Sequence, residues 1–103
     1  MYTHKVTLVR PNTSAPFYYD SLLTTQEYLD FKQNYISKEL WVSENVSVSE
    51  DGLTFTRIVE FISKAAYDKV MTEWSASHSF YVKQFNEYAI TNNHTVTFEA
   101  FES

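Results

Sequence analysis

The chain has 103 residues and 44% of them are hydrophobic, which predicts one ordered domain over residues 1–103 and leaves no room for a second core. A net charge of −5 with only eight Lys and Arg excludes the clustered basic residues that a nucleic-acid partner requires. The absence of cysteine, of a membrane-spanning apolar run and of a signal peptide favours a cytoplasmic protein without disulfides.

Aromatic residues make up 17% of the chain, with eight Phe, eight Tyr and two Trp. Aromatic side chains dominate the buried area of cores and interfaces. One small core does not easily hide so many rings. The surplus predicts a dimer surface or a pocket lined by rings.

The first predicted element is a strand over His4–Arg10, where apolar and polar residues alternate. Val6, Leu8 and Arg10 share one side of this strand by parity. Pro11 ends it.

A long connection follows over Asn12–Leu23 and contains three consecutive aromatic residues, Phe17, Tyr18 and Tyr19. Connections of this length are typically functional or disordered, and three adjacent rings argue against disorder. We expect this segment to act as a lid over a pocket.

The next elements are a helix, a strand and a tight turn. Thr24 and Glu27 have the spacing of a capping box, which starts a helix that runs to about Lys38. A second strand is expected over Leu40–Ser49, with Asn45 as an alternative start. The sequence Glu50–Asp51–Gly52 then predicts a hairpin turn.

The clearest strand of the chain is Leu53–Ile62, which alternates throughout. One face is apolar apart from a single arginine and comprises Leu53, Phe55, Arg57, Val59 and Phe61. The other face comprises Thr54, Thr56, Ile58 and Glu60.

The last third predicts a broken helix and a final strand. Ser63 caps the first helical part, the small polar run Ser75–Ser79 interrupts it, and a second part ends near Asn92. An alternating strand is expected over Thr95–Phe101.

The predicted order β, α, β, β, α, β indicates an α+β fold of the ferredoxin-like βαββαβ type. Its four-stranded antiparallel sheet has helices on one face only. The opposite face is too apolar to stay in water, which predicts a homodimer formed through that face. Its expected members are Thr7, Val9, Thr56, Ile58, Thr97 and Phe101.

The second half of the chain resembles the dimeric α+β-barrel superfamily, which includes the antibiotic-biosynthesis monooxygenase-like proteins. The resemblance covers about Leu53 to Glu99 and is carried by the run Phe61 to Tyr67, then Trp74, Tyr88, Asn92, Asn93 and Thr95 to Glu99. It implies two ferredoxin-like chains packed sheet against sheet, each often with a ligand pocket between its sheet and helices. The activities it implies are diverse, from cofactor-free oxidation of polyketides to haem degradation, and a shared fold does not choose among them.

The two arginines on the predicted helix-covered face are the sharpest polar signal. Arg10 and Arg57 lie on neighbouring antiparallel strands, and a buried guanidinium needs an anion and hydrogen-bond acceptors. One interpretation is a clamp for a ligand carboxylate or phosphate. The alternative is an internal salt bridge, or exposure at the sheet edge. The acidic residues considered as internal partners are Asp20, Glu27, Asp30 and Glu73.

No metal or cofactor is expected from the histidines. His4 and His94 fall at opposite ends of antiparallel strands, and a shared metal site needs them together. His78 follows Trp74 too closely to match the haem-degrading branch, and it is expected in an exposed loop.

These features predict a homodimeric binding protein, or a weak or cofactor-free oxygenase-like enzyme, for an elongated apolar small molecule with an acidic head, such as a fatty acid or polyketide. Its expected ligand-binding residues are Arg10, Phe17, Tyr18, Tyr19, Phe55, Arg57, Met71, Trp74 and Phe85. The alternative is a structural or protein-interaction module whose pocket is filled by its own side chains. Cofactor-free oxygenation requires a base and a polarised substrate oxygen, and the sequence singles out no such pair.

Overall fold

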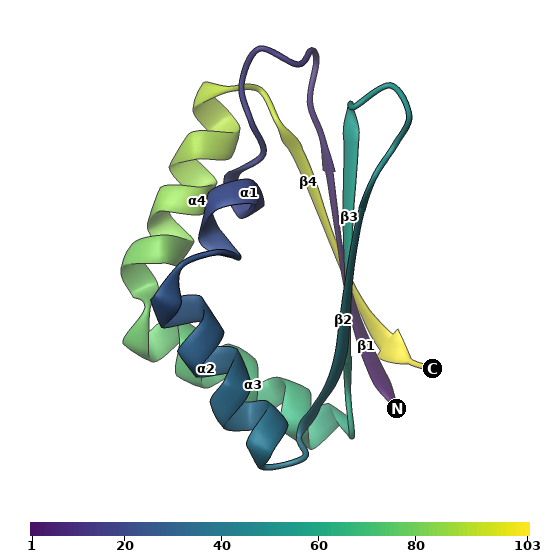
Figure 1. Cartoon of the computed structure of the whole chain (residues 1–103), viewed down its shortest axis with the longest axis vertical. Coiled ribbons are helices and arrows are strands. Elements are labelled where there is room, and N and C mark those ends of the chain that lie inside the picture. Colours follow the sequence, from purple (N-terminus) through teal and green to yellow (C-terminus); the bar gives the residue numbers. More distant parts are fainter.

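The computed structural model describes all 103 residues, which form four strands and four helices (Figure 1). Its four strands form one antiparallel sheet in the order β2-β3-β1-β4. In chain order the elements are β1 (Tyr2–Val9), α1 (Tyr18–Leu22), α2 (Gln26–Ser37), β2 (Trp41–Val48), β3 (Thr54–Phe61), α3 (Lys64–Ser77), α4 (Ser79–Thr91) and β4 (Thr95–Glu102). The ferredoxin-like topology predicted from the sequence is confirmed.

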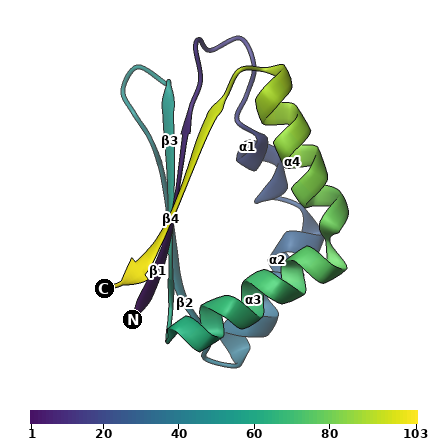
Figure 2. The ribbon, with the colours of Figure 1, turned by 180° about the vertical axis from the view of Figure 1, so that it is seen from behind.

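All the helices lie on the same side of the sheet, as the two opposite views show (Figures 1 and 2). In β3 buried residues alternate with half-buried ones, and Phe55, Arg57, Val59 and Phe61 are the buried set. β1 pairs with β3 so that Val6 is opposite Arg57. The predicted apolar face of β3 is therefore the face that the helices cover.

The buried residues form two apolar clusters on this face. One lies beneath α1 and α4 and contains Leu8, Phe17 and Phe55. The other lies beneath α2 and α3 and contains Tyr35, Val59 and Phe61. Arg57 sits in the row of β3 between Phe55 and Val59, where the two clusters meet.

The helix ends follow the predicted chemistry with one shift. Thr25, rather than Thr24, caps α2 by accepting a hydrogen bond from the backbone N–H of Tyr28. Ser63 caps α3 as expected, with Oγ 3.1 Å from the backbone nitrogen of Ala66. Gly52 has a φ of 75°, the left-handed conformation that the predicted hairpin turn requires.

Two segments differ from the expected elements. The connection after β1 contains the short helix α1, in which Tyr18 and Leu22 are buried. His78 separates α3 from α4 and is half-buried, with its ring stacked 4.3 Å from that of Trp74, so its expected place in an exposed loop is wrong.

β2 carries an irregularity that changes which of its residues face the helices. The register with β3 shifts between Trp41 and Ser43, so Trp41 pairs with Phe61 while Glu44 pairs with Val59. Simple alternation would place Trp41 and Glu44 on opposite faces. A bulge reverses that parity, and both side chains point toward the helices.

The outer face of the sheet has no helix over it (Figure 2). The register places Thr7 between Thr56 and Thr97, and Lys5 opposite Ile58, so the residues of the predicted dimer face do share one surface. Phe101 on this face is 45% exposed. None of the helices combines the length and apolarity that crossing a bilayer requires.

Candidate functional site

A cavity of about 370 Å³ lies between the sheet and the helices. Its lining is mainly aromatic and aliphatic. Every strand and every helix contributes at least one residue, and β2 contributes Trp41 alone. The rings that line it include Tyr19, Tyr28, Phe31, Trp41, Trp74 and Phe85. Side chains of the core therefore leave a space that they do not fill.

The cavity opens toward β4 and the α3–α4 layer. Among its lining residues, Ser75 of α3, Asn86 of α4 and Phe98 of β4 are exposed and form the rim. Arg57 lies deep inside, with only 5% of the residue exposed. The site is thus an apolar chamber with a polar residue in its interior and a small polar rim, the usual composition of a small-molecule pocket.

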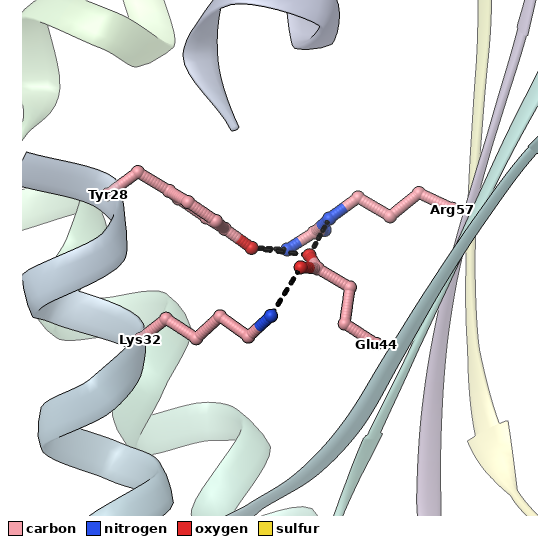
Figure 3. A network of polar contacts seen from close by, with 4 residues as sticks. All are labelled: Tyr28, Lys32, Glu44 and Arg57. Carbon is pink, nitrogen blue, oxygen red and sulfur yellow. Dashed lines mark hydrogen bonds and ion pairs between the residues drawn. The ribbon is translucent and has the colours of Figure 1, made fainter. Parts of the chain in front are cut away.

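Arg57 is held by two hydrogen bonds inside the chain (Figure 3). Its Nε donates to Oε2 of Glu44 at 2.7 Å, and its Nη2 donates to the Tyr28 hydroxyl at 3.1 Å. The guanidinium also lies 5.5 Å from the ring centroid of Tyr19. No acceptor in the chain is found for Nη1, and that atom is not fully enclosed, so its N–H groups are available to a guest in the cavity that Arg57 lines.

Glu44 is the centre of the polar network in Figure 3. Oε2 accepts hydrogen bonds from Arg57 and from the Tyr28 hydroxyl, and Oε1 pairs with Lys32 at 2.8 Å. The side chains of Glu44 and Arg57 are only 8% and 6% exposed. The network ties α2 to β2 and β3, and its charges sum to +1 from two cations and one carboxylate.

The pKa shifts of Glu44, Tyr28 and Arg57 keep these three residues in their ordinary charge states at neutral pH. Burial alone would raise the pKa of Glu44, but Arg57, Lys32 and Tyr28 together hold it below its usual value. Burial raises the pKa of the Tyr28 hydroxyl, which stays protonated and donates to Glu44. Burial also works against the charge of Arg57, yet its acidic and phenolic neighbours raise its pKa, so it remains a cation.

His4 is the other polar residue buried in the cavity wall, with 7% of its surface exposed. Its ring stacks on Phe98 at 6.1 Å and tilts against Tyr67 at 5.4 Å. Burial, reinforced by the charge of Arg57 and partly offset by the backbone of Glu99, lowers the pKa of His4 to about 4. The imidazole is therefore neutral at physiological pH.

His4 should make stability depend on pH. The unfolded imidazole takes up a proton below about pH 6.5, whereas the folded one resists until about pH 4, so stabilisation is complete above pH 6.5 and lost as the pH falls toward 4. Lowering the pH from 7.5 to 5.0 should cost about 2 kcal/mol of unfolding free energy through His4.

Urea unfolding of the wild type and of His4→Phe at both pH values measures this contribution. His94 also has a lowered pKa, so the difference between the two proteins isolates His4. Equal pH dependence in both proteins would show that His4 does not titrate differently on unfolding.

Five of the nine residues expected to bind a ligand line the cavity: Tyr19, Arg57, Met71, Trp74 and Phe85. Phe55 lies in the core, 1% exposed and stacked on Tyr19. Phe17 and Tyr18 lie away from the cavity, packed on Phe55 and on Phe85 respectively. Of the predicted lid segment Asn12–Leu23, Tyr19 and Leu22 line the cavity, and of its three consecutive aromatic residues only Tyr19 does.

Arg10 does not join Arg57, which corrects the expected arginine pair. β1 ends at Val9, and the guanidinium of Arg10 donates to the carbonyls of Gly52 and Ala15, both at 2.8 Å. It also lies 4.2 Å from the ring centroid of Phe17. Arg10 therefore fastens the connection after β1 to the β2–β3 turn.

The sequence missed Glu44, Lys32 and His4 as site residues. Arg57 pairs with Glu44 rather than with any of the four acidic residues considered for it. The bulge in β2 hid Glu44, as described above. His4 had a usable signal, because strand parity places it on the same side as Val6 and Leu8.

No protein-family model and no curated protein matches this chain. Three solved structures resemble it over its whole length. A dimeric ferredoxin-like protein from an uncultured marine organism is 12% identical, with 94% of that chain covered and a TM-score of 0.56. A Deinococcus radiodurans protein provisionally named an antibiotic biosynthesis monooxygenase is 17% identical, with 92% covered and a TM-score of 0.58. The protein Rv0793 from Mycobacterium tuberculosis is 13% identical, with 95% covered and a TM-score of 0.57.

Proposed function

We propose that this chain binds an uncharged, ring-bearing apolar small molecule in the cavity beneath its helices. Its fold supports the proposal, since the chain shares it with a dimeric ferredoxin-like protein and with a protein provisionally named an antibiotic biosynthesis monooxygenase. The observation that carries this proposal is the unfilled, ring-lined space of about 370 Å³ around Arg57. An apolar cavity of that size favours an apolar guest over water.

The size of the cavity indicates the size of the ligand. An engineered apolar cavity of about 150 Å³ accommodates one benzene ring. This cavity is more than twice as large. It suits a ligand of two or three fused rings, or a short chain attached to a ring.

The internal partner of Arg57 argues against the acidic head that the sequence suggested. Glu44 already pairs with the guanidinium at 2.7 Å, so burying Arg57 requires no ligand carboxylate. The donor that remains is Nη1, which suits a carbonyl, ether or hydroxyl oxygen. We therefore propose a neutral acceptor oxygen near Arg57 and aromatic contacts elsewhere.

Two candidate bases of the site are poor proton acceptors at neutral pH, so the proposal is for binding rather than for oxygenation. Glu44 receives three hydrogen bonds and its pKa is lowered, and the pKa of His4 is about 4. An efficient general base has a pKa near the working pH.

A structural module without a ligand is the second candidate. The internal Arg57–Glu44 pair favours it, since such a pair accounts for the buried arginine by itself. The open cavity favours ligand binding instead, because a purely structural core packs to a density that leaves few voids larger than a water molecule.

Thermal unfolding with added ligand separates the two candidates. With 2-methoxynaphthalene at ten times its dissociation constant, the wild type should melt at least about 5 °C higher. Met71→Trp should abolish the shift by filling the cavity, and Thr72→Trp, next to it but exposed and outside the lining, should keep it.

Dodecanoic acid serves as the comparison ligand in the same assay. It should stabilise less than the aromatic ether, because Arg57 is already paired. A shift with the acid alone would restore the acidic-head interpretation. No shift with either compound would favour the structural module.

The second part of the proposal is that two copies pack through the outer sheet face. That face carries Ile58 and Phe101 among threonines, with no helix to cover them. Of the similar structures, one is described as dimeric. A twofold interface would hide this face in both copies at once.

A further inference from the structure

The imidazole of His4 is buried in the wall of the cavity and makes no hydrogen bond of good geometry within the chain, although the backbone of Glu99 lies close enough to raise its pKa. We propose that His4 selects ligands that carry a hydroxyl group, by accepting a hydrogen bond from that hydroxyl. This inference rests on the proposed function, and it names a feature of the ligand that Arg57 alone does not determine.

The two nitrogens of His4 differ in their surroundings. Nδ1 is completely enclosed and unpartnered. Nε2 also forms no hydrogen bond, but it is not among the completely enclosed atoms, so it is the nitrogen that a guest can reach. A neutral imidazole carries one donor and one acceptor nitrogen. With the proton on the enclosed Nδ1, Nε2 presents its lone pair to the cavity.

The place of His4 is fixed by its neighbours. The stacked ring of Phe98 and the tilted ring of Tyr67 hold the imidazole plane. Across the β1–β3 pair, His4 is opposite Val59 and Val6 is opposite Arg57. His4 and Arg57 are thus diagonal neighbours on one face, with Cα atoms about 7–8 Å apart.

The chemistry of the two residues is complementary. Arg57 offers only donors, while the accessible nitrogen of His4 is an acceptor. A hydroxyl satisfies both kinds of group, because it donates and accepts. A carboxylate has no proton to give to Nε2, and a cationic head would meet the like charge of Arg57. The low pKa of His4 supports this assignment, since the acceptor is not lost to protonation near neutral pH.

Pairing Nε2 also supplies a driving force. A ligand without a hydroxyl proton leaves this acceptor unpaired inside the filled cavity, whereas a ligand hydroxyl gives it a partner.

Isothermal titration calorimetry with 2-naphthol and 2-methoxynaphthalene tests the proposal. Both compounds carry an acceptor oxygen, and only the naphthol carries a hydroxyl proton. The wild type should bind the naphthol about three- to tenfold more tightly, the range that one net hydrogen bond gives. In His4→Phe, which keeps a ring against Phe98, the two compounds should bind equally.

Two further variants test whether a loss of the preference reflects the missing imidazole or a general disturbance of the fold. His94→Phe changes a buried histidine that does not line the cavity, and it should keep the preference. His4→Gln keeps an acceptor oxygen and should retain part of it, which also provides a measurement if the phenylalanine variant folds poorly.

The possible failures are distinguishable. Equal binding of both compounds by the wild type, or a preference that persists in His4→Phe, overturns the role of His4 and leaves the proposed function intact. Binding of neither compound overturns the proposed function and this inference with it.

Discussion

Replacing Glu44 with leucine is expected to lower the free energy of unfolding by about 3–5 kcal/mol. The reason is that Glu44 is the only carboxylate paired with Arg57, whose side chain is 6% exposed. Without it the guanidinium keeps one hydrogen bond, to Tyr28, and loses its counter-ion. A buried cation without an anion is among the most costly defects a small domain can carry.

The double variant Glu44→Leu with Arg57→Leu should recover most of that loss. Removing both charges leaves no stranded ion, and apolar replacements of buried ion pairs are commonly neutral or stabilising. Lys32 then loses its partner but is 25% exposed and can turn to water. Urea unfolding at one fixed protein concentration measures all three proteins, because dimer formation links stability to concentration.

The matched control is the exposed ion pair between Lys64 and Asp68, whose N–O distance of 2.8 Å is close to the 2.7 Å between Arg57 and Glu44. Asp68→Ala should leave the unfolding curve almost unchanged, since exposed pairs contribute little. A Glu44→Leu protein as stable as this control would show that Arg57 finds another partner or water, and the network would lose its structural role.

Replacing Ile58 with lysine is expected to split the proposed dimer. Ile58 lies on the outer face opposite Lys5, so a lysine there places two like charges side by side in each copy. A twofold interface doubles the defect. Burying these unpaired charges should raise the dimer dissociation constant by at least about 100-fold, a change of ~3 kcal/mol.

Sedimentation velocity at micromolar concentration gives the answer directly. The wild type should sediment as two chains of 12.1 kDa and Ile58→Lys as one. Ile90→Lys, on the outer side of α4 where the residue is 77% exposed, should remain a dimer. A wild type that sediments as a folded monomer would refute the sheet-to-sheet interface.

Strand alternation is the reason that the sequence placed Arg57 correctly. β3 is regular from end to end, so period-two parity puts Arg57 in a buried apolar row, and the structure confirms it. The same rule failed for Glu44, because one bulge in β2 exchanges the two faces of that strand. The amino-acid composition of β2 does not indicate the bulge. The burial of Arg57 could therefore be predicted from the sequence, whereas its pairing with Glu44 could not.

Arg10 shows a second limit, at the end of a strand. Strand parity predicts the direction of a side chain only within the strand, and β1 ends at Val9, one residue before Arg10. Beyond that residue, local acceptors decide, and the Gly52 carbonyl of the hairpin turn is one of them. The turn was predicted from Asp-Gly, but its contact with Arg10 depends on tertiary packing.

The aromatic residues divide between core and cavity in a way that sequence periodicity does not reveal. Phe55 and Trp74 both follow the expected pattern, yet one is buried in the core and the other lines the open space. Whether a ring touches a neighbour or a void depends on the distance between layers. That distance is set by side chains from several elements together.

The most direct test of the central claim is a crystal structure of the protein grown with 2-bromonaphthalene, with bromine located by its anomalous scattering. The account predicts a bromine peak inside the cavity, with the rings between Met71 and Trp74 and Arg57 beside them. A peak only on the outer face near Ile58 and Phe101, or none within the cavity, would contradict it.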